Sequence, residues 1–232
     1  MRRAPPKSLP GLAEPGQKPV RPKDSGSLII LRRSGDGLDV LMGRRGKKAV
    51  FGGVFVFPGG KVDAADRSVG FASDLAPDVL TRISKDQRRA RGFSVAAVRE
   101  TFEETGLLLA GPADVGSTRH ETWMDFAARG VAPDLGKLGY VGHAITPSKR
   151  KARFNARFFF AWADQMSGEL GGSGELADLD FFPLQEALKL PLVDVTEFML
   201  LEIQRRNEEN LRPRETYPFF SYRTDSPYIR YS

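Results

Sequence analysis

The segment 94–107, S-V-A-A-V-R-E-T-F-E-E-T-G-L, constrains this chain more than any other. On an α-helix each residue turns the chain by roughly 100°, so three carboxylates share one face: Glu100, Glu103 and Glu104. Apolar residues fall on the opposite face: Val95, Val98 and Phe102. We therefore predict an amphipathic helix, with Ser94 as its N-cap and Gly106 at its C-terminal end.

Like charges at these spacings repel each other and destabilise an isolated helix. Clustered carboxylate oxygens are also the ligands that Mg²⁺ and Mn²⁺ prefer in proteins. The helix alone therefore fits either a metal site or a solvated acidic face on which Arg99 serves as a local ion partner.

A second segment, from Phe57 to Asp66, reads F-P-G-G-K-V-D-A-A-D. Together with the helix it resembles the signature of the Nudix hydrolases, in which a glycine, five residues, an acid and seven residues precede Arg-Glu-apolar-x-Glu-Glu-x-Gly-apolar. Gly60 stands at the first glycine and Asp66 at the first acid, where the family usually has Glu. Thr101 occupies a usually apolar position, and the other positions of the second half match: Arg99, Glu100, Glu103, Glu104, Gly106 and Leu107.

An insertion separates the two halves of this motif. Residues 67–98 stand where the family usually has seven residues, so about 25 residues are added. The interruption resembles the branch of the family that includes the peroxisomal coenzyme A diphosphatases. Because residues 67–93 would lie beside the active site, they form either a lid or specificity element, or a surface excursion.

The resemblance implies a fold and a reaction. The implied fold is the Nudix α/β/α sandwich, with a mixed β-sheet and a carboxylate-bearing helix. The implied activity is a hydrolysis, dependent on Mg²⁺ or Mn²⁺, of the pyrophosphate bond in a nucleoside diphosphate linked to another group. Coenzyme A or an acyl-coenzyme A is the leading substrate, and ADP-ribose, dinucleotides and damaged nucleotides stay open. Two alternatives are a Nudix-fold sensor that binds a nucleotide metabolite without turnover and an RNA-processing, decapping-like hydrolase.

The resemblance also implies roles for individual residues. The expected metal site consists of the three glutamates and the backbone of one glycine: Glu100, Glu103, Glu104 and Gly60. Catalytic roles are expected for four residues, without a decision on the general base: Glu103, Glu100, Arg99 and Glu175. Arg99 would orient a glutamate through a bidentate pair. Glu175 precedes a strand-then-helix element and is otherwise an exposed loop acid. Substrate phosphates are expected to contact three arginines from basic loops, which are otherwise solvated cations: Arg153, Arg150 and Arg45.

Composition narrows the classes of site and partner. The chain has no cysteine and two histidines, which excludes thiolate chemistry and disfavours a multi-histidine zinc site. A formal net charge of +6 suits anionic partners. The basic residues are spread along the chain, so we expect a phosphate-containing small-molecule substrate rather than nucleic acid. No apolar run has the length of a transmembrane helix, so we expect no membrane partner and a cytoplasmic location. A homodimer is left open.

The predicted organisation is a Pro-rich basic tail at 1–24, a hydrolase domain at 25–210 and a C-terminal extension at 211–232 that packs on the domain or on a partner. Periodicity predicts strands at 28–31, 38–42, 140–145, 153–162 and 179–184. Helices are expected near 77–83, 120–129 and 191–206. The apolar stripe of the second of these helices carries Trp123 and Phe126, which indicates packing more than a platform for a base.

Overall fold

The computed structural model of the chain describes residues 18–35, 37–46, 52–223 and 226–232. Residues 1–17 of the predicted tail lie outside these ranges. The first strand begins at Lys23, two residues before the predicted start of the folded domain.

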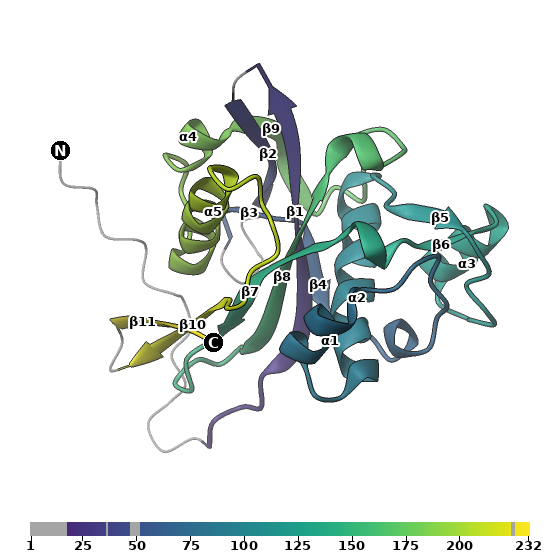
Figure 1. The fold of residues 1–232 in the computed structure, drawn as a ribbon, viewed down its shortest axis with the longest axis horizontal. Helices are drawn as coiled ribbons and strands as arrows, with labels where there is room; N and C mark the ends of the chain where they lie inside the picture. The colour runs from purple at the N-terminus through teal and green to yellow at the C-terminus, as the bar shows by residue number, and fades with distance from the viewer. Residues whose placement is uncertain (1–17, 36, 47–51, 224–225) are drawn as a thin grey trace.

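A mixed nine-stranded sheet runs through the molecule (Figure 1). Its strands lie in the order β11-β10-β7-β8-β1-β2-β3, while β4 pairs with β1 and β9 pairs with β2. Two neighbouring pairs are parallel, β1 with β8 and β10 with β7. The bounds are β1 Lys23–Ser34, β2 Gly37–Arg45, β3 Phe55–Val56, β4 Gly59–Lys61, β7 Gly139–Ile145, β8 Phe154–Trp162, β9 Leu176–Pro183, β10 Pro218–Arg223 and β11 Ser226–Tyr231.

Helices cover both faces of this sheet. One layer holds α1 (Pro77–Ile83), α2 (Gln87–Thr105) and α3 (Glu121–Ala128), and the other holds α4 (Leu184–Ala187) and α5 (Asp194–Asn207) (Figure 1). A small hairpin of β5 (Ala110–Pro112) and β6 (Val131–Pro133) lies beside α3. A strand covered on both faces needs apolar side chains throughout, and residues 28–31 of β1 are indeed fully buried. The predicted α/β/α sandwich is confirmed, as are the predicted strands and helices within a few residues.

The carboxylate helix begins earlier than predicted. Ser94 lies inside α2, where its hydroxyl donates a hydrogen bond to the carbonyl of Arg91, so its assignment as the N-cap is wrong. The N-cap is Asp86, whose carboxylate accepts from the N–H of Arg89 at 3.1 Å. The C-terminal end is as predicted, because Gly106 adopts the left-handed conformation, with φ of 75°, that closes many helices.

The insertion is part of the core rather than a separate excursion. Its residues form α1 and the first two turns of α2. Its apolar side chains belong to the core cluster on this face of the sheet: Leu75, Val79, Leu80, Ile83, Ala90 and Phe93. The C-terminal extension likewise packs on the domain. Its strand β10 pairs with β7 and buries Phe220, and β11 then extends the sheet.

Candidate active site

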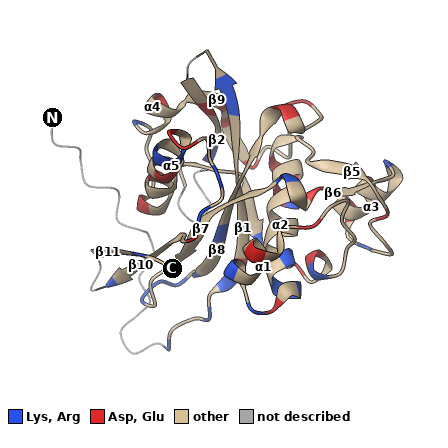
Figure 2. Ribbon diagram, in the orientation of Figure 1, with Lys and Arg blue, Asp and Glu red and all other residues tan. Residues whose placement is uncertain are grey.

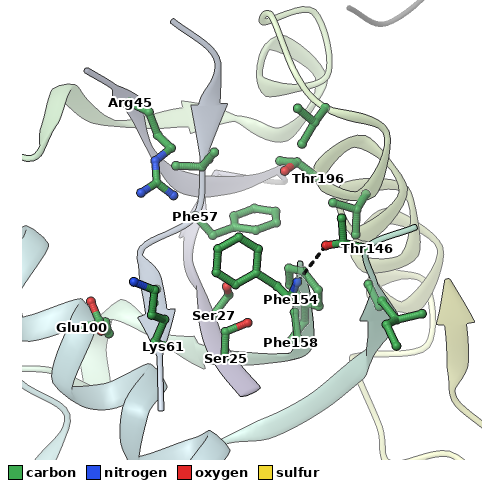
Figure 3. Close-up of a pocket in the computed structure, with 18 of the residues that line it drawn as sticks. Ser25, Ser27, Arg45, Phe57, Lys61, Glu100, Thr146, Phe154, Phe158 and Thr196 are labelled. Carbon is green, nitrogen blue, oxygen red and sulfur yellow. Dashed lines mark hydrogen bonds between the residues drawn. The ribbon is translucent and has the colours of Figure 1, made fainter. Parts of the chain in front are cut away.

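A cavity of about 500 Å³ opens between the sheet and the start of α5 (Figure 3). This size is typical of small-molecule sites. One part of the wall carries six charged side chains: Arg45, Lys61, Asp63, Glu100, Glu104 and Glu175. Residues from β7, β8, α5 and β10 supply apolar side chains to another part of the wall. None of the lining residues comes from the insertion 67–93, so within the described residues the insertion supplies no wall of this cavity.

Two glycines of β4, Gly59 and Gly60, lie directly against carboxylates of α2. The carboxylate of Glu104 accepts a hydrogen bond from the N–H of Gly59 at 2.8 Å. Gly59 has a φ of 153°, and any side chain there would collide with the backbone of Gly26 and Ser27. A Cβ on Gly60 would collide with the carboxylate of Glu100. The two glycines therefore let the β4 backbone lie directly against the glutamates of α2.

Burial makes these two carboxylates unusually weak acids. Glu104 is almost fully buried. Its burial raises its pKa to about 8, a shift that the Gly59 hydrogen bond opposes and the charge of Glu100 increases. Burial also raises the pKa of Glu100 to about 7. The charge of Arg99 opposes this shift, and the charge of Glu103 adds to it. Glu100 and Glu104 of the predicted acidic face are therefore largely shielded from solvent, whereas the side chain of Glu103 is 30% exposed.

Arg99 lies at the centre of an ion-pair network. Its guanidinium donates two hydrogen bonds, of 2.9 and 3.0 Å, to the fully buried carboxylate of Asp66. It also contacts Glu100 and Glu103 at 3.0 Å each and donates to the carbonyl of Lys61. The bidentate partner of Arg99 is thus Asp66, and both glutamates receive single contacts. Asp66 also accepts from the indole of Trp123 and the N–H of Asp63, so every observed contact ties it to neighbouring structure.

Glu103 has different surroundings from the other two glutamates. One of its carboxylate oxygens contacts Arg99, and the other accepts a hydrogen bond from the hydroxyl of Thr122 on α3. Its side chain does not line the cavity, whereas Glu100 and Glu104 do. Among the described residues, no three acidic or histidine side chains already converge as a complete set of metal ligands.

The donor chemistry of the cavity nevertheless fits a hard divalent cation. Glu100 and Glu104 present buried carboxylates to the same space, and Glu175 and Asp63 line it as well. Burial raises the pKa values of Glu100 and Glu104, and a bound cation would stabilise the charged forms of these two carboxylates. Oxygen donors of this kind suit Mg²⁺ or Mn²⁺ rather than a soft metal.

The predicted phosphate contacts separate into two groups. Arg45 lines the cavity, and its guanidinium lies on the side of Lys61 and Glu100 (Figure 3). Arg153 and Arg150 do not line it. Arg153 donates instead to the carbonyls of Thr146 and Val20. Lys and Arg elsewhere are distributed over many elements rather than along one stripe (Figure 2).

Three other lining residues complete the comparison with the sequence. Glu175, which precedes β9, lies at the cavity as the sequence led us to expect of a site residue. Lys61 and Asp63 were not singled out, although both stand in the Phe57–Asp66 segment. Asp63 also lies 3.5 Å from the imidazole of His120. Lys61 ends β4 and Asp63 follows two residues later, so the alternation of side chains along an extended chain was the available signal for both.

Comparison with known proteins supports the fold. A Nudix hydrolase from Alicyclobacillus acidocaldarius superposes with a TM-score of 0.59 and 27% sequence identity, covering 78% of this chain and 90% of that one. The chain has the fold of the Nudix hydrolases. It also carries carboxylates at the family's motif positions, and it is an enzyme of the Nudix pyrophosphohydrolase type.

Two further Nudix structures resemble this chain less closely. A MutT protein from Bacillus halodurans has a TM-score of 0.48 and 16% identity, covering 89% of this chain and 97% of that one. The Nudix domain of NrtR from Shewanella oneidensis, solved with ADP-ribose, has a TM-score of 0.47 and 12% identity, covering 81% and 90%. No family model matches the sequence, and no curated protein sequence does. Within the described residues, no helix has the length and hydropathy needed to cross a membrane.

Proposed function

We propose that this chain hydrolyses the pyrophosphate bond of a nucleoside diphosphate linked to another group, with Mg²⁺ or Mn²⁺ as cofactor. The observation that carries the proposal is a cavity that buried carboxylates and cations line together. Glu100 and Glu104 line it, and Arg45 and Lys61 line the same space. A phosphoanhydride needs this pairing, because its anionic oxygens must be neutralised before a water can approach.

In this proposal Glu100 and Glu104, with Glu175, hold the metal. A bound Mg²⁺ or Mn²⁺ supplies a water of lowered pKa and neutralises phosphate charge. Gly60 keeps the backbone close enough to hold the Glu100 carboxylate in place. Glu103 is retained as a catalytic residue, and its contact with Arg99 sets its direction. Arg99 itself is a positioning residue, because it touches three carboxylates and is only 3% exposed.

The chain's own residues account for the remaining requirements. Water adds to one phosphorus, the bridging P–O bond breaks, and two phosphomonoesters leave. The proton of the water passes to a carboxylate of the site. Arg45 and Lys61 contact the phosphate oxygens, whose charge they match. Arg150 stays a prediction as a substrate contact. For Arg153 we propose a structural role instead, because its guanidinium donates to two backbone carbonyls.

Coenzyme A or an acyl-coenzyme A is the substrate we propose first. What supports it is the motif text from Phe57 to Asp66 followed by the long insertion. Coenzyme A carries the required pyrophosphate between two larger groups. ADP-ribose, dinucleotides and damaged nucleotides are the other members of the same chemical class.

Turnover on a substrate panel tests this proposal. The panel holds coenzyme A, acetyl-coenzyme A, ADP-ribose, NADH, a diadenosine polyphosphate and a capped RNA, each with Mg²⁺, with Mn²⁺ and with EDTA. We expect metal-dependent cleavage of one small-molecule class, which EDTA abolishes. Cleavage of capped RNA alone would replace this function by an RNA-processing one. Thermal shifts with ligands but no turnover on any substrate would replace it by a nucleotide sensor.

A further inference from the structure

The first turn of α3 contacts two acids of the motif from outside the cavity. The hydroxyl of Thr122 donates a hydrogen bond to the carboxylate of Glu103. The indole of the next residue, Trp123, donates to the carboxylate of Asp66. Neither Thr122 nor Trp123 lines the cavity. Their helix lies in the same layer as α2 and follows the motif in the chain (Figure 1). Two consecutive residues outside the motif therefore bind two of its acids.

The contact between Trp123 and Asp66 is buried. Trp123 is fully buried, and its N–H lies 3.1 Å from a carboxylate oxygen of Asp66. Two edge-to-face ring pairs keep the indole in place, because Trp123 packs on Phe126 at 4.9 Å between centroids and Phe126 packs on Phe102 of α2 at 5.5 Å. A buried carboxylate is costly unless donors satisfy its oxygens. The apolar stripe of α3 therefore also supplies a donor to a buried acid.

The contact between Thr122 and Glu103 completes the surroundings of that glutamate. Thr122 donates to one carboxylate oxygen, and Arg99 donates to the other at 3.0 Å. Hydrogen bonds to a charged acceptor are stronger than those between neutral groups. Glu103 is therefore held from two helices, by Arg99 of α2 and by Thr122 of α3.

The two contacts of α3 converge on Arg99. Its guanidinium binds Asp66 through two hydrogen bonds and Glu103 through one. A guanidinium is planar, and its donors point in fixed directions. Because α3 holds both of these carboxylates, it also holds the plane of the guanidinium. The remaining ion pair of Arg99, at 3.0 Å, is with Glu100, which lines the cavity.

We infer that Thr122 and Trp123 are positioning residues, which act through Arg99 to set the direction in which Glu100 faces the cavity. The inference rests on the proposed function, because it makes α3 a support of the metal site proposed there. Neither residue touches the reacting groups. Losing either contact should therefore weaken cation binding and slow turnover, while the substrate keeps its own contacts with the cavity wall.

Mn²⁺ binding in the absence of substrate, measured by calorimetry, tests the role of Thr122. Thr122→Val keeps the shape of the side chain without its hydroxyl, whereas Thr122→Ser keeps the hydroxyl. We expect Thr122→Val to bind Mn²⁺ about tenfold more weakly than the wild-type protein, and Thr122→Ser to bind it as the wild type does. Thr81→Val is the matched control, because Thr81 is exposed on α1 and its hydroxyl donates to the Pro77 carbonyl. Wild-type affinity in Thr122→Val would overturn the inference for Thr122.

Trp123→Phe tests the second contact, because it removes the indole N–H and keeps an aromatic ring. The chain's other tryptophan, Trp162 on β8, provides the matched control. Trp162 does not line the cavity, and its ring packs on Phe160 and beneath the guanidinium of Arg33. We expect Trp123→Phe and Trp162→Phe both to lower the melting temperature, and only Trp123→Phe to weaken Mn²⁺ binding. A lower melting temperature with unchanged Mn²⁺ affinity would make Trp123 a packing residue alone.

Steady-state kinetics at saturating Mn²⁺ separates this inference from the proposed function. Thr122→Val and Trp123→Phe should lower kcat and leave KM within about twofold of the wild-type value. A wild-type protein without turnover, beside weakened Mn²⁺ binding in both variants, would overturn the proposed hydrolysis and retain the inference. Normal turnover and normal Mn²⁺ affinity in both variants would do the reverse. A wild-type protein that binds no Mn²⁺ would overturn both.

Discussion

The backbone of Gly60 lies so close to Glu100 that the carboxylate occupies the space a Cβ would need. Nothing else in the loop explains a glycine there as directly, because Gly60 has no positive φ. The contact joins the two halves of the motif across the insertion. It makes the position of one glutamate depend on a residue 40 positions earlier in the chain.

Gly60→Ala therefore should displace the Glu100 carboxylate. We expect kcat/KM to fall by about 10²-fold, because a shift of roughly 1 Å in a reacting group costs that much. Gly171→Ala is the matched control, since a Cβ there meets only one carbonyl, at an ordinary contact distance. Steady-state kinetics on the substrate found by the panel would measure both. Equal activity of the two variants would show that Glu100 tolerates displacement.

Glu104→Gln separates catalysis from folding. The amide keeps an acceptor for the Gly59 N–H but carries no charge, and burial already raises the pKa of Glu104 to about 8. We expect turnover to fall on the order of 10³-fold while the melting temperature without metal stays equal or rises. The stabilisation that Mg²⁺ or Mn²⁺ gives the wild-type protein should also shrink. Glu186→Gln, at an exposed ion pair with Lys189, is the control. Normal turnover in Glu104→Gln would remove Glu104 from the metal site.

Glu103→Gln tests the one glutamate of the three that does not line the cavity. Its contacts with Arg99 and Thr122 hold it outside the cavity wall in this structure. We still expect a loss of turnover by orders of magnitude with little change in melting temperature, as the motif implies. Wild-type turnover in this variant, beside a loss in Glu104→Gln, would reduce the functional set to the two glutamates that line the cavity.

The fold and the main glutamates were predictable because their signals are local. An apolar run at 28–31 and carboxylates at helical spacing need no knowledge of distant residues. The start of α2 was missed because Ser94 and Asp86 are both good N-caps. The deciding signal was the spacing of Ala90, Phe93 and Ala97, all fully buried, which continues the helix upstream of Ser94.

The direction of the arginines was harder to predict, since it depends on how strands pair. Along β8, Phe154, Ala156 and Phe158 face the cavity, so the alternation of side chains sends Arg153 to the opposite face. That alternation is visible in the sequence, but which face holds the cavity is decided by α5 and β10. The shape of the cavity was unpredictable for the same reason, because its walls come from segments more than 150 residues apart in the chain.

Arg45 and Arg153 make a discriminating pair of substitutions. Arg45→Ala should raise KM about tenfold with a smaller effect on kcat, because it removes a cation that faces the phosphate site. Arg153→Ala should lower the melting temperature and leave KM unchanged, because its partners are the carbonyls of Thr146 and Val20. A raised KM in Arg153→Ala with an unchanged melting temperature would return Arg153 to the substrate site.

Asp24 should make the stability of the fold sensitive to acid. Burial alone would raise its pKa, but hydrogen bonds from Arg89 and Asn155, the charge of Arg89 and a hydrogen bond from Arg67 outweigh burial and lower the pKa to about 2. A carboxyl group whose pKa is lower in the folded protein stabilises the fold above its unfolded pKa of about 4. That contribution, about 1–2 kcal/mol after solvent screening, is lost as the pH falls from about 4 toward 2.

Urea unfolding of the wild-type protein and Asp24→Asn across pH 2 to 6 would measure this contribution. The wild-type protein should be the more stable at pH 6, and the difference should shrink as the pH falls below 4. Asp125→Asn, at an exposed ion pair with Arg129, is the matched control and should show a much smaller pH dependence. If the difference between wild type and Asp24→Asn were constant across this range, Asp24 would not titrate with a lowered pKa. The contacts of Arg67 and of Arg89, at the start of α2, with Asp24 on β1 would then contribute little to the pH dependence of stability.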